Sequence, residues 1–386
     1  VMSRLVYSTG VFEFEMPLHD ADPALFLNRM AALPALPTVA GPLPDIVVWL
    51  NESTFNPDNF ALPHAHLPHL AMFDDDASTL ASGLMRTHTF GGKTWLSEFS
   101  MLTGLVPDDF GARRNLVFNS VAPEVNSSLV RLLKDNGYHT VVLMPTPKRF
   151  YGAARTYGAL GFDEILTLRD FHEYDAIPGD EWDIADSDRL AAAAQTLIAR
   201  HRSGPDGQQP IFLYMLSIHE HAPYSPRTPI RYNLDHAGLK RSLAAKFTDY
   251  VQKLGLLNVG IGMMDRLVAG SAPRRMLFCY FGDHQAYYED ASPPYRYNLR
   301  EPKNITQFQI RTNYPSASTV HVPLMDIAMI PGLIADDAGV KKDAYFTALS
   351  AMRQLCSGRL EDCLDAPLVE SYKGYIFSSA LGLFKP

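Results

Sequence analysis

Five short apolar runs, separated by segments with helical periodicity, constrain the fold of this chain more than any other feature of its sequence. The runs are rich in Val, Ile, Leu and aromatic residues and cover residues 45–50, 139–144, 210–217, 275–281 and 320–325. Continuous apolar runs of this length are typical of strands covered on both faces. Helical periodicity is found at residues 95–102, 124–136, 186–202, 240–268 and 341–355. The alternation predicts an α/β fold, a three-layer α/β/α sandwich around a mostly parallel sheet.

The first part of the chain differs from the rest in its prolines, which stand at Pro17, Pro23, Pro34, Pro37 and Pro42. Frequent prolines suit a tether better than a core element. We therefore expect residues 1–42 to form an N-terminal linker and residues 43–386 to form one folded domain. A Val before the first Met indicates that the chain is cut from a longer protein.

Charge and hydropathy exclude two classes of partner or element. A formal net charge of -8 leaves no basic surface of the kind that nucleic acid binding needs, so we exclude nucleic acid as a partner. The most apolar stretch, residues 322–334, is shorter than a membrane-spanning helix and is interrupted by Asp326 and two prolines.

The three cysteines are of two kinds. Cys279 lies inside an apolar run, so we expect it to be a buried small hydrophobic residue. Cys356 and Cys363 lie close together in a late polar segment. In an oxidising compartment they could form a local disulfide, and two free thiols are the alternative.

Ligands of a parallel α/β sheet bind beyond the carboxyl ends of its strands, so the residues after each predicted strand are the candidate site. Glu52 follows the first strand, and Asp283 and His284 follow the run at residues 275–281. Carboxylates and an imidazole at one edge are suitable ligands for a divalent metal ion.

A glycine turn, Gly91-Gly92-Lys93-Thr94, leads into the helix predicted at residues 95–102. Thr94 could be a helix N-cap, or its hydroxyl could be a nucleophile at a helix N-terminus, where an anion is stabilised. The turn is not a Walker A loop, because Thr87 stands where that motif requires its first glycine.

Two histidines, His219 and His221, follow the strand predicted at residues 210–217. Neighbours at i and i+2 of an extended segment face the same side, so both could point into the site.

These segments occur in a recognisable order: Glu52, Gly92-Lys93-Thr94, His221-Ala222-Pro223-Tyr224 and Gly282-Asp283-His284. The set resembles the lipoteichoic acid synthase type of phosphoglycerol transferase and, more distantly, the phosphoethanolamine transferases, within the alkaline-phosphatase/sulfatase superfamily. The resemblance covers about residues 43–330. It implies one divalent cation (Mn²⁺, Zn²⁺ or Mg²⁺) held by Glu52, Asp283, His284 and the oxygen of Thr94.

The resemblance also implies a reaction. A phospho-head group, phosphoglycerol or phosphoethanolamine, would pass from a phospholipid donor through a phospho-Thr94 intermediate to a glycan or lipid acceptor. His221 is the expected general acid and His219 a weaker candidate that contacts substrate. Lys93 could stabilise the phosphate, and a solvated lysine is the alternative.

The segment from Arg149 to Tyr157 resembles the family's head-group pocket, in which an aromatic residue is followed by an arginine. Tyr151 stands where the family has Trp, and Ala153 stands where it has Arg. Arg149 or Arg155 would then contact the phosphate, or the head group differs.

Three alternatives compete with the transferase. A sulfatase needs a Cys/Ser-x-Pro-x-Arg motif, which the sequence lacks. A two-metal phosphatase or related phosphodiesterase would need further Asp and His ligands. A non-catalytic binding domain would have no reason to keep Glu52, Thr94, Asp283 and His284 together.

Family members usually carry transmembrane helices before a catalytic domain that faces the periplasm or cell exterior. By resemblance, we expect this chain to be such a domain, attached to the membrane through an N-terminal region missing from this sequence. Two loops rich in Tyr and Arg could form an acceptor groove, with ordinary exposed surface as the alternative. Their residues are Tyr224, Arg227, Arg231 and Tyr232 in one loop, and Tyr287, Tyr288, Tyr295, Arg296, Tyr297 and Arg300 in the other.

Overall fold

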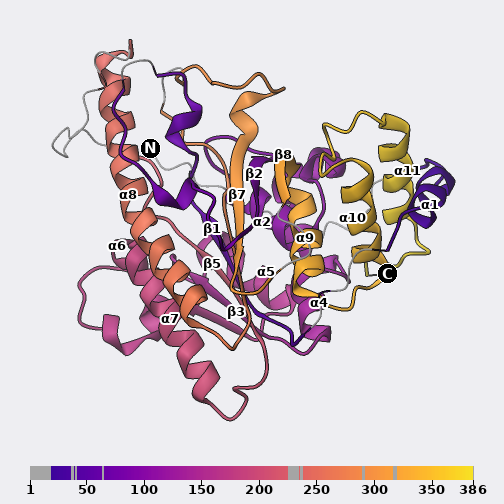
Figure 1. Cartoon of the computed structure of the whole chain (residues 1–386), viewed down its shortest axis with the longest axis horizontal. Helices are drawn as coiled ribbons and strands as arrows, with labels where there is room; N and C mark the ends of the chain where they lie inside the picture. Colours follow the sequence, from indigo (N-terminus) through magenta and orange to yellow (C-terminus); the bar gives the residue numbers. More distant parts are fainter. Residues whose placement is uncertain are drawn as a thin grey trace.

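The computed structural model describes residues 19–35, 39, 41–62, 65–224, 234, 238–288, 292–315 and 320–385. Within these residues, the centre of the molecule is an eight-stranded sheet in the order β4-β3-β5-β1-β6-β7-β2-β8 (Figure 1). The strands are β1 (Asp45–Asn51), β2 (Thr79–Arg86), β3 (His139–Met144), β4 (Glu164–Thr167), β5 (Ile211–Leu216), β6 (Met276–Gly282), β7 (Ile305–Thr312) and β8 (Val320–Asp326). Among these strands, only the two pairings of β7 are antiparallel. The predicted mostly parallel sheet and its five predicted strands are confirmed.

The helices described are α1 (Ala24–Ala31), α2 (Thr94–Thr103), α3 (Val117–Ser120), α4 (Leu129–Asp135), α5 (Ala153–Leu160), α6 (Glu181–Ile184), α7 (Ser187–Ser203), α8 (Arg241–Gly270), α9 (Ile330–Ala338), α10 (Ala344–Leu355) and α11 (Ala366–Ile376). Helices α2, α7, α8 and α10 confirm four predicted helices. The fifth, expected from residue 124, begins later because the Ser128 hydroxyl caps α4 by accepting a hydrogen bond from the Arg131 amide. None of the described helices combines the length and apolar character that crossing a membrane requires.

The alternating side chains of β1 enter two separate cores, which establishes the three layers. Ile46, Val48 and Leu50 pack in the core that includes residues of α2, α9 and α10. Val47 and Trp49 pack in the core that includes residues of α7 and α8. Figure 1 shows α7 and α8 on one side of the sheet and α2 and α9 on the other. The predicted α/β/α sandwich is confirmed.

Three strands, β2, β4 and β7, were not predicted from the sequence. Of these, β2 and β7 were missed because they contain polar residues that become buried. Gln309 and Arg311 of β7 are almost fully buried. The Tyr280 hydroxyl donates to Gln309 Oε1, and Arg311 donates to Asp265 Oδ2 at 2.6 Å. In β2, a side chain at Gly83 would meet the Val322 carbonyl. Partners supplied by distant segments therefore make these sequences possible in a central sheet.

Helix α1 differs from the expectation that residues 1–42 form a linker. Phe26 is fully buried and packs edge-on against Tyr372 of α11, and its amide donates to the Ser371 hydroxyl. An eight-residue helix with one apolar face can bury that face against another helix, which proline counting does not detect. The domain boundary at residue 43 stays a prediction, but residues 24–31 are packed onto the domain.

The structure shows the state of all three cysteines. Cys356 and Cys363 form a disulfide with a Cα–Cα distance of 5.3 Å, and Cys279 is a buried free cysteine in β6.

Candidate metal and catalytic site

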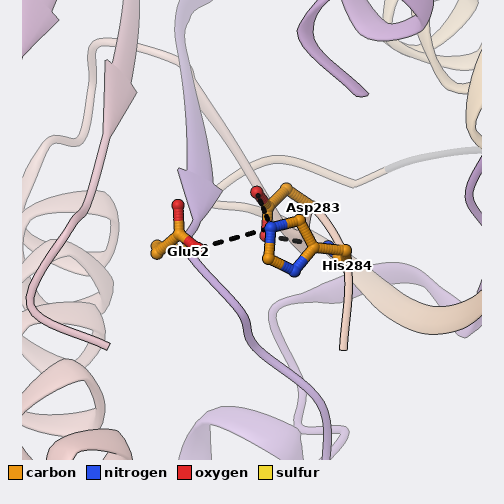
Figure 2. Close-up of side chains that lie close together, drawn as sticks. All are labelled: Glu52, Asp283 and His284. Carbon is orange, nitrogen blue, oxygen red and sulfur yellow. Dashed lines mark hydrogen bonds and ion pairs between the residues drawn. The ribbon is translucent and has the colours of Figure 1, made fainter. Parts of the chain in front are cut away.

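Parallel pairing of β1 with β6 brings the three predicted metal-binding side chains together. Asn51 at the end of β1 pairs with Gly282 at the end of β6. Glu52 follows directly after β1, and Asp283 and His284 follow directly after β6. Figure 2 shows their side chains pointing toward one another. The sheet register therefore creates the cluster.

Gly282 is required where β6 ends, because the backbone of the chain after β1 passes very close to it. A Cβ at this position would lie 1.8 Å from the Thr54 carbonyl oxygen. The Thr306 hydroxyl donates to the Gly282 carbonyl at 2.7 Å. Close approach, and not a left-handed backbone, is the reason for this glycine.

The ligand atoms of the cluster lie at distances that suit one metal ion. His284 Nε2 lies 3.4 Å from Glu52 Oε1 and 3.2 Å from Asp283 Oδ2, and all three residues are at most 2% exposed. Asp283 Oδ2 and His284 Nε2 are buried without a hydrogen bond. His284 Nδ1 lies 3.0 Å from the Gln285 carbonyl, which favours a proton on Nδ1 and leaves the Nε2 lone pair facing the carboxylates. These unpaired atoms and this donor set fit one divalent ion.

Backbone and hydroxyl groups orient the two carboxylates. Asp283 Oδ1 accepts from the amides of Ser53 at 2.7 Å and His284 at 2.8 Å. Glu52 Oε1 accepts from the Ser53 hydroxyl at 2.7 Å. Ser53 has a left-handed backbone with φ 50°, a strained conformation for a non-glycine residue. The turn after β1 therefore holds both carboxylates in place.

Asp283 is a strong candidate for cation binding on electrostatic grounds. Burial raises the pKa of its carboxyl well above the usual range, and the neighbouring Glu52 carboxylate raises it further. The nearby Thr94 hydroxyl and the hydrogen bonds from the amides of Ser53 and His284 act in the opposite direction. Two neighbouring buried carboxylates repel each other, so the pair needs a proton or a cation between its oxygens.

Thr94 begins helix α2 and faces the cluster. Its hydroxyl donates to Glu52 Oε2 at 3.1 Å. Lys93 occupies the N-cap position with a left-handed backbone, φ 65°, so Thr94 is not the cap that the alternative interpretation expected. As the first residue of α2, Thr94 lies at the positive end of the helix dipole, which favours an anion there.

A cavity of about 180 Å³ opens beside Thr94. Five of the predicted site residues line it: Glu52, Lys93, Thr94, Tyr151 and His221. The Lys93 ammonium is exposed and donates to Asn115 Oδ1 at 3.0 Å. His221 is exposed, and its Nδ1 contacts the Ala222 carbonyl.

His219 lies apart from His221. Residues 218–221 form a turn, in which the His221 amide donates to the Ile218 carbonyl, so the extended geometry expected for the two histidines is wrong. His219 Nδ1 lies 3.2 Å from Asp186 Oδ1, and the ring lines another cavity. A substrate contact by His219 stays a prediction without support from this geometry.

Arg149 and Arg155 are exposed and do not line the cavity beside Thr94. Tyr151 between them does line it, with a left-handed backbone, φ 35°. Trp95, Phe150 and Trp182 form further aromatic walls of this cavity. These aromatic residues were not predicted as part of the site. Trp182 comes from a different segment, and its ring meets that of Phe150 at a centroid distance of 4.6 Å in the folded chain.

A buried carboxyl behind Tyr151 was also missed as a site residue. Glu98 of α2 is fully buried and accepts hydrogen bonds from the hydroxyls of Tyr151, at 2.5 Å, and Tyr157. Burial raises the pKa of Glu98 from its ordinary value of 4.5 to about 7, against the lowering effect of the two tyrosines. The signal in the sequence was a lone Glu on an otherwise apolar helix face.

Glu220 supports the site from the other side. Its carboxylate accepts from the hydroxyls of Ser187 and Ser217, each at 2.6 Å. Ser217 Oγ in turn accepts from the Glu52 amide at 3.0 Å. Burial raises the pKa of Glu220, and its hydrogen bonds lower it. Glu220 therefore positions the backbone of a predicted metal ligand.

The described residues of the Tyr- and Arg-rich loops are mostly occupied by internal contacts. Arg296 donates to the Phe60 carbonyl, and Arg300 contacts Asp362. The Tyr297 hydroxyl donates to the Pro302 carbonyl. Arg227, Arg231 and Tyr232 lie outside the described residues. These contacts favour the alternative, a structural surface, over an acceptor groove.

Comparisons with known proteins agree with the fold. A model of the sulfatase family matches residues 44–327. An uncharacterized protein of Haemophilus influenzae is 34% identical over 373 residues, which are 96% of this chain and 67% of that protein. The capsular polysaccharide biosynthesis protein RkpI of Rhizobium meliloti is 24% identical over 254 residues, 65% of this chain and 43% of its own length. The chain thus spans less than half of RkpI.

Three solved structures share the fold at low sequence identity. The phosphoglycerol transferase GacH of Streptococcus pyogenes, in complex with sn-glycerol-1-phosphate, has a TM-score of 0.68 at 16% identity, covering 94% of each chain. The lipoteichoic acid synthase LtaP of Listeria monocytogenes has a TM-score of 0.58 at 16% identity, covering 83% of this chain and 78% of that chain. The C-terminal periplasmic domain of EcEptC from Escherichia coli, in complex with Zn, has a TM-score of 0.54 at 17% identity, covering 81% of this chain and 88% of that chain.

Proposed function

This chain belongs to the sulfatase family, and from that premise we propose that it is a metal-dependent transferase of phospho-head groups. The group, phosphoglycerol or phosphoethanolamine, would come from a phospholipid and pass through a phospho-Thr94 intermediate to a glycan or lipid acceptor. The observation that carries the proposal is the hydroxyl of Thr94 at the start of α2, 3.1 Å from Glu52 Oε2 and next to a buried Asp283–His284 pair.

The residue at the nucleophile position distinguishes the proposed transferase from an enzyme that hydrolyses sulfate esters within the same family. Thr94 stands in a Gly-Lys-Thr turn, and the chain has no Cys/Ser-x-Pro-x-Arg motif. A threonine hydroxyl is a weak nucleophile until a base or a cation activates it. A divalent ion, held by Glu52, Asp283, His284 and Thr94 Oγ1, would lower the pKa of that hydroxyl and neutralise charge on the phosphoryl group.

The chain's own residues perform the remaining tasks. Thr94 Oγ1 attacks phosphorus and loses its proton, which Glu52 Oε2 is placed to accept. The phosphorus–oxygen bond to diacylglycerol breaks, and the leaving oxygen takes a proton from His221, an exposed imidazole at the cavity rim. In the second half, an acceptor hydroxyl attacks the phospho-Thr94 ester and gives its proton to His221, and the released Thr94 oxygen takes back the proton held by Glu52.

The cavity beside Thr94 supports a head group as its occupant. Trp95, Phe150, Tyr151 and Trp182 enclose apolar space, and the exposed Lys93 stands at its edge. Aromatic faces accommodate both the carbons of a glycerol unit and an ammonium group. The two head groups are therefore both substrates to test.

We propose that the chain acts at the periplasmic or extracellular face of the membrane, where a phospholipid donor is available. The Cys356–Cys363 disulfide supports an oxidising compartment. The EcEptC structure is described as a periplasmic domain.

The decisive experiment compares wild type with Thr94→Ala and Thr94→Ser, using vesicles of phosphatidylglycerol or phosphatidylethanolamine. We expect wild type to release diacylglycerol and to carry a phospho-head-group adduct on Thr94, detected by mass spectrometry of the intact chain. Thr94→Ala should lose at least about 10³-fold in activity and form no adduct, because no nucleophile remains. Thr94→Ser keeps a hydroxyl and should retain measurable turnover.

Folding of each variant is checked by circular dichroism. Wild-type rates in folded Thr94→Ala protein would refute the mechanism. Diacylglycerol release without any acceptor product would identify a hydrolase of the same family instead.

A further inference from the structure

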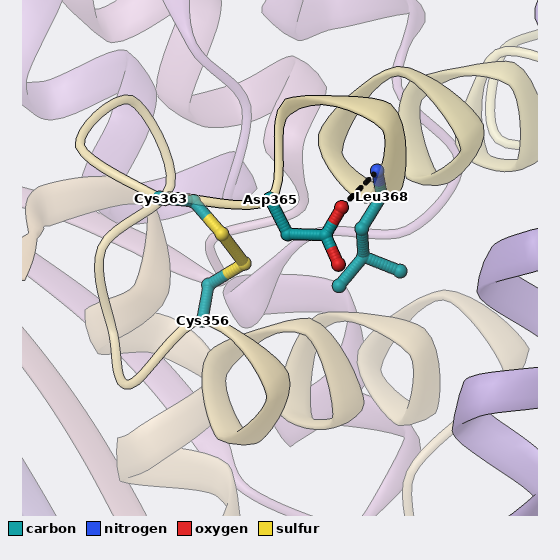
Figure 3. The surroundings of a disulfide bond; sticks show 4 residues. All are labelled: Cys356, Cys363, Asp365 and Leu368. Atoms are coloured by element: carbon teal, nitrogen blue, oxygen red, sulfur yellow. Dashed lines mark hydrogen bonds between the residues drawn. A yellow bond between two sulfur atoms is a disulfide. The ribbon is translucent and has the colours of Figure 1, made fainter.

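A second group of potential metal ligands lies outside the cavity beside Thr94. It consists of His88, Asp108 and Glu361, whose ligand atoms all lie within 4.8 Å of one another. His88 follows β2, Asp108 lies in the 3-10 helix Pro107–Leu116, and Glu361 lies between Cys356 and Cys363 in the sequence. Figure 3 shows the disulfide that closes this loop. Three segments that are distant in the sequence therefore converge on one point.

The distances within the group are too long for good hydrogen bonds. His88 Nδ1 lies 3.5 Å from Asp108 Oδ2 and 3.5 Å from Glu361 Oε1. N–H···O hydrogen bonds are usually about 2.7–3.2 Å long. Ligands held about 2.0–2.2 Å from one zinc ion lie about 3.0–3.5 Å from one another, so the two distances from His88 Nδ1 fit a shared ion.

Each of the three ligands has its other polar atom engaged by a partner. His88 Nε2 lies 3.1 Å from Asp326 Oδ1, and both residues are at most 2% exposed. Arg114 donates to Asp108 Oδ1, and Arg300 contacts Glu361 Oε2 at 3.4 Å.

These outer contacts determine which atoms face the centre of the group. In a metal-bound state the Nε2 proton of His88 would be directed at Asp326, which would leave the lone pair on Nδ1, between the two carboxylates. A carboxylate that fixes the far nitrogen of a histidine is the usual outer contact of a metal-binding imidazole. Nδ1 of the buried His88 ring is thus aimed at two acidic oxygens, an arrangement that either a proton or a divalent cation on Nδ1 would stabilise.

We propose that His88 Nδ1, Asp108 Oδ2 and Glu361 Oε1 bind a second divalent metal ion of the zinc type, separate from the catalytic site. One imidazole and two carboxylates are suitable ligands for Zn²⁺ or Mn²⁺, and a fourth position is left for water. The side chains of Asp108 and Glu361 are 45% and 25% exposed, so an ion can enter from solvent. The bound ion joins the loop before Thr94 to the disulfide loop.

The alternative is a protonated His88 that forms ion pairs with the same carboxylates and binds no metal. Metal analysis separates the two without any assay of catalysis, so failure here is distinguishable from failure of the proposed function. The chain is stripped with EDTA, exposed to Zn²⁺, passed through gel filtration and analysed by inductively coupled plasma mass spectrometry.

The informative background is Asp283→Asn, which disables the catalytic site. In that background we expect one Zn²⁺ per chain, and none after addition of Asp108→Asn and Glu361→Gln. Both added substitutions are isosteric and lie at partly exposed positions, so the variant should still fold. Circular dichroism checks this. The matched control Glu370→Gln, an exposed carboxyl on neighbouring α11, should keep the ion.

Zn²⁺ should also raise the thermal midpoint of Asp283→Asn and not that of the triple variant, because an ion bound only to folded protein stabilises it. In titrations, the triple variant should bind Zn²⁺ at least about tenfold more weakly. Equal Zn²⁺ content in the two variants, or no zinc in Asp283→Asn, would overturn the second site.

Discussion

At the scale of single residues, Glu98 shows how burial changes the chemistry of a carboxyl. It lies inside the first two turns of α2, yet two tyrosine hydroxyls, from Tyr151 and Tyr157, donate to it. Tyr151 is also a wall of the cavity beside Thr94. Glu98 therefore positions a substrate-facing ring from behind.

Glu98→Gln should change the pH dependence of stability. Burial raises the pKa of Glu98 from 4.5 to about 7 in the folded chain. The protonated carboxyl therefore contributes to the free energy of unfolding. This contribution is fully present below pH 4.5 and is lost as the pH rises to about 7, because the folded state must then hold a buried charge. The variant lacks this loss, so its free energy of unfolding relative to wild type should rise by about 3 kcal/mol between pH 4 and pH 8.

Urea unfolding across that pH range measures the difference. Asp135→Asn, an exposed carboxyl at the end of α4, is the matched control and should show no such trend. A constant difference between Glu98→Gln and wild type would mean that Glu98 titrates normally.

Metal binding at the catalytic site should depend on each of its ligands. Glu52→Gln removes a charged oxygen that lies 3.4 Å from His284 Nε2. We expect the variant to lose one equivalent of Zn²⁺ or Mn²⁺ relative to wild type and at least about 100-fold in diacylglycerol release. Elemental analysis after gel filtration measures the first quantity. Unchanged metal content with lost activity would assign Glu52 to proton transfer alone.

At the scale of elements, a short loop between α10 and α11 connects separate parts of the molecule. The Cys356–Cys363 disulfide closes this loop (Figure 3). Asp362 in the loop pairs with the buried Arg86 guanidinium at the end of β2. The cross-link therefore holds a charged partner of the central sheet in place.

Cys356→Ser combined with Cys363→Ser should lower the free energy of unfolding by about 2.5 kcal/mol. The closure of an eight-residue loop restricts the unfolded chain, and the loss of this restriction favours unfolding. Guanidinium denaturation of the double variant and of wild type, each under non-reducing conditions, gives the value. If reduction of wild type with dithiothreitol leaves its midpoint unchanged, the disulfide does not stabilise the chain.

At the scale of the whole molecule, the N-terminal helix α1 closes against the C-terminal helix α11. Figure 1 shows the two helices side by side at one end of the molecule. A side chain at Gly374 would lie 2.0 Å from the Ala21 carbonyl, so the approach is close. The segment read as a tether is thus partly a structural element.

Phe26→Ala should lower the free energy of unfolding by about 3–5 kcal/mol, because it leaves a cavity where a fully buried ring packed against Tyr372. Thermal unfolding measures the loss. Leu25→Ala is the matched control, since Leu25 is 38% exposed on the same helix and should cost much less. Equal, small effects of the two substitutions would return α1 to the status of a loosely attached linker.

The sequence by itself determined the sheet type and the order of the main site residues. Apolar runs at β1, β3, β5 and β6 are long enough to recognise, because strands buried on both faces need continuous apolar side chains. The edge strand β8 was also recognised, although His321 and Pro323 in it are exposed. The candidate residues Glu52, Asp283 and His284 could be found because strand ends are where parallel sheets bind ligands, and Thr94 because a glycine turn leads into a helix N-terminus there. Local patterns carry this information directly.

Only the tertiary structure decided which other polar residues act with them. Glu98, Glu220 and His88 are single residues in ordinary segments, and their roles depend on partners supplied by distant parts of the chain. The turn at residues 218–221 separates His219 from His221, and the exposed positions of Arg149 and Arg155 follow from how the chain packs around Tyr151. A buried polar group is stable only when a partner meets it, and no local pattern specifies that partner.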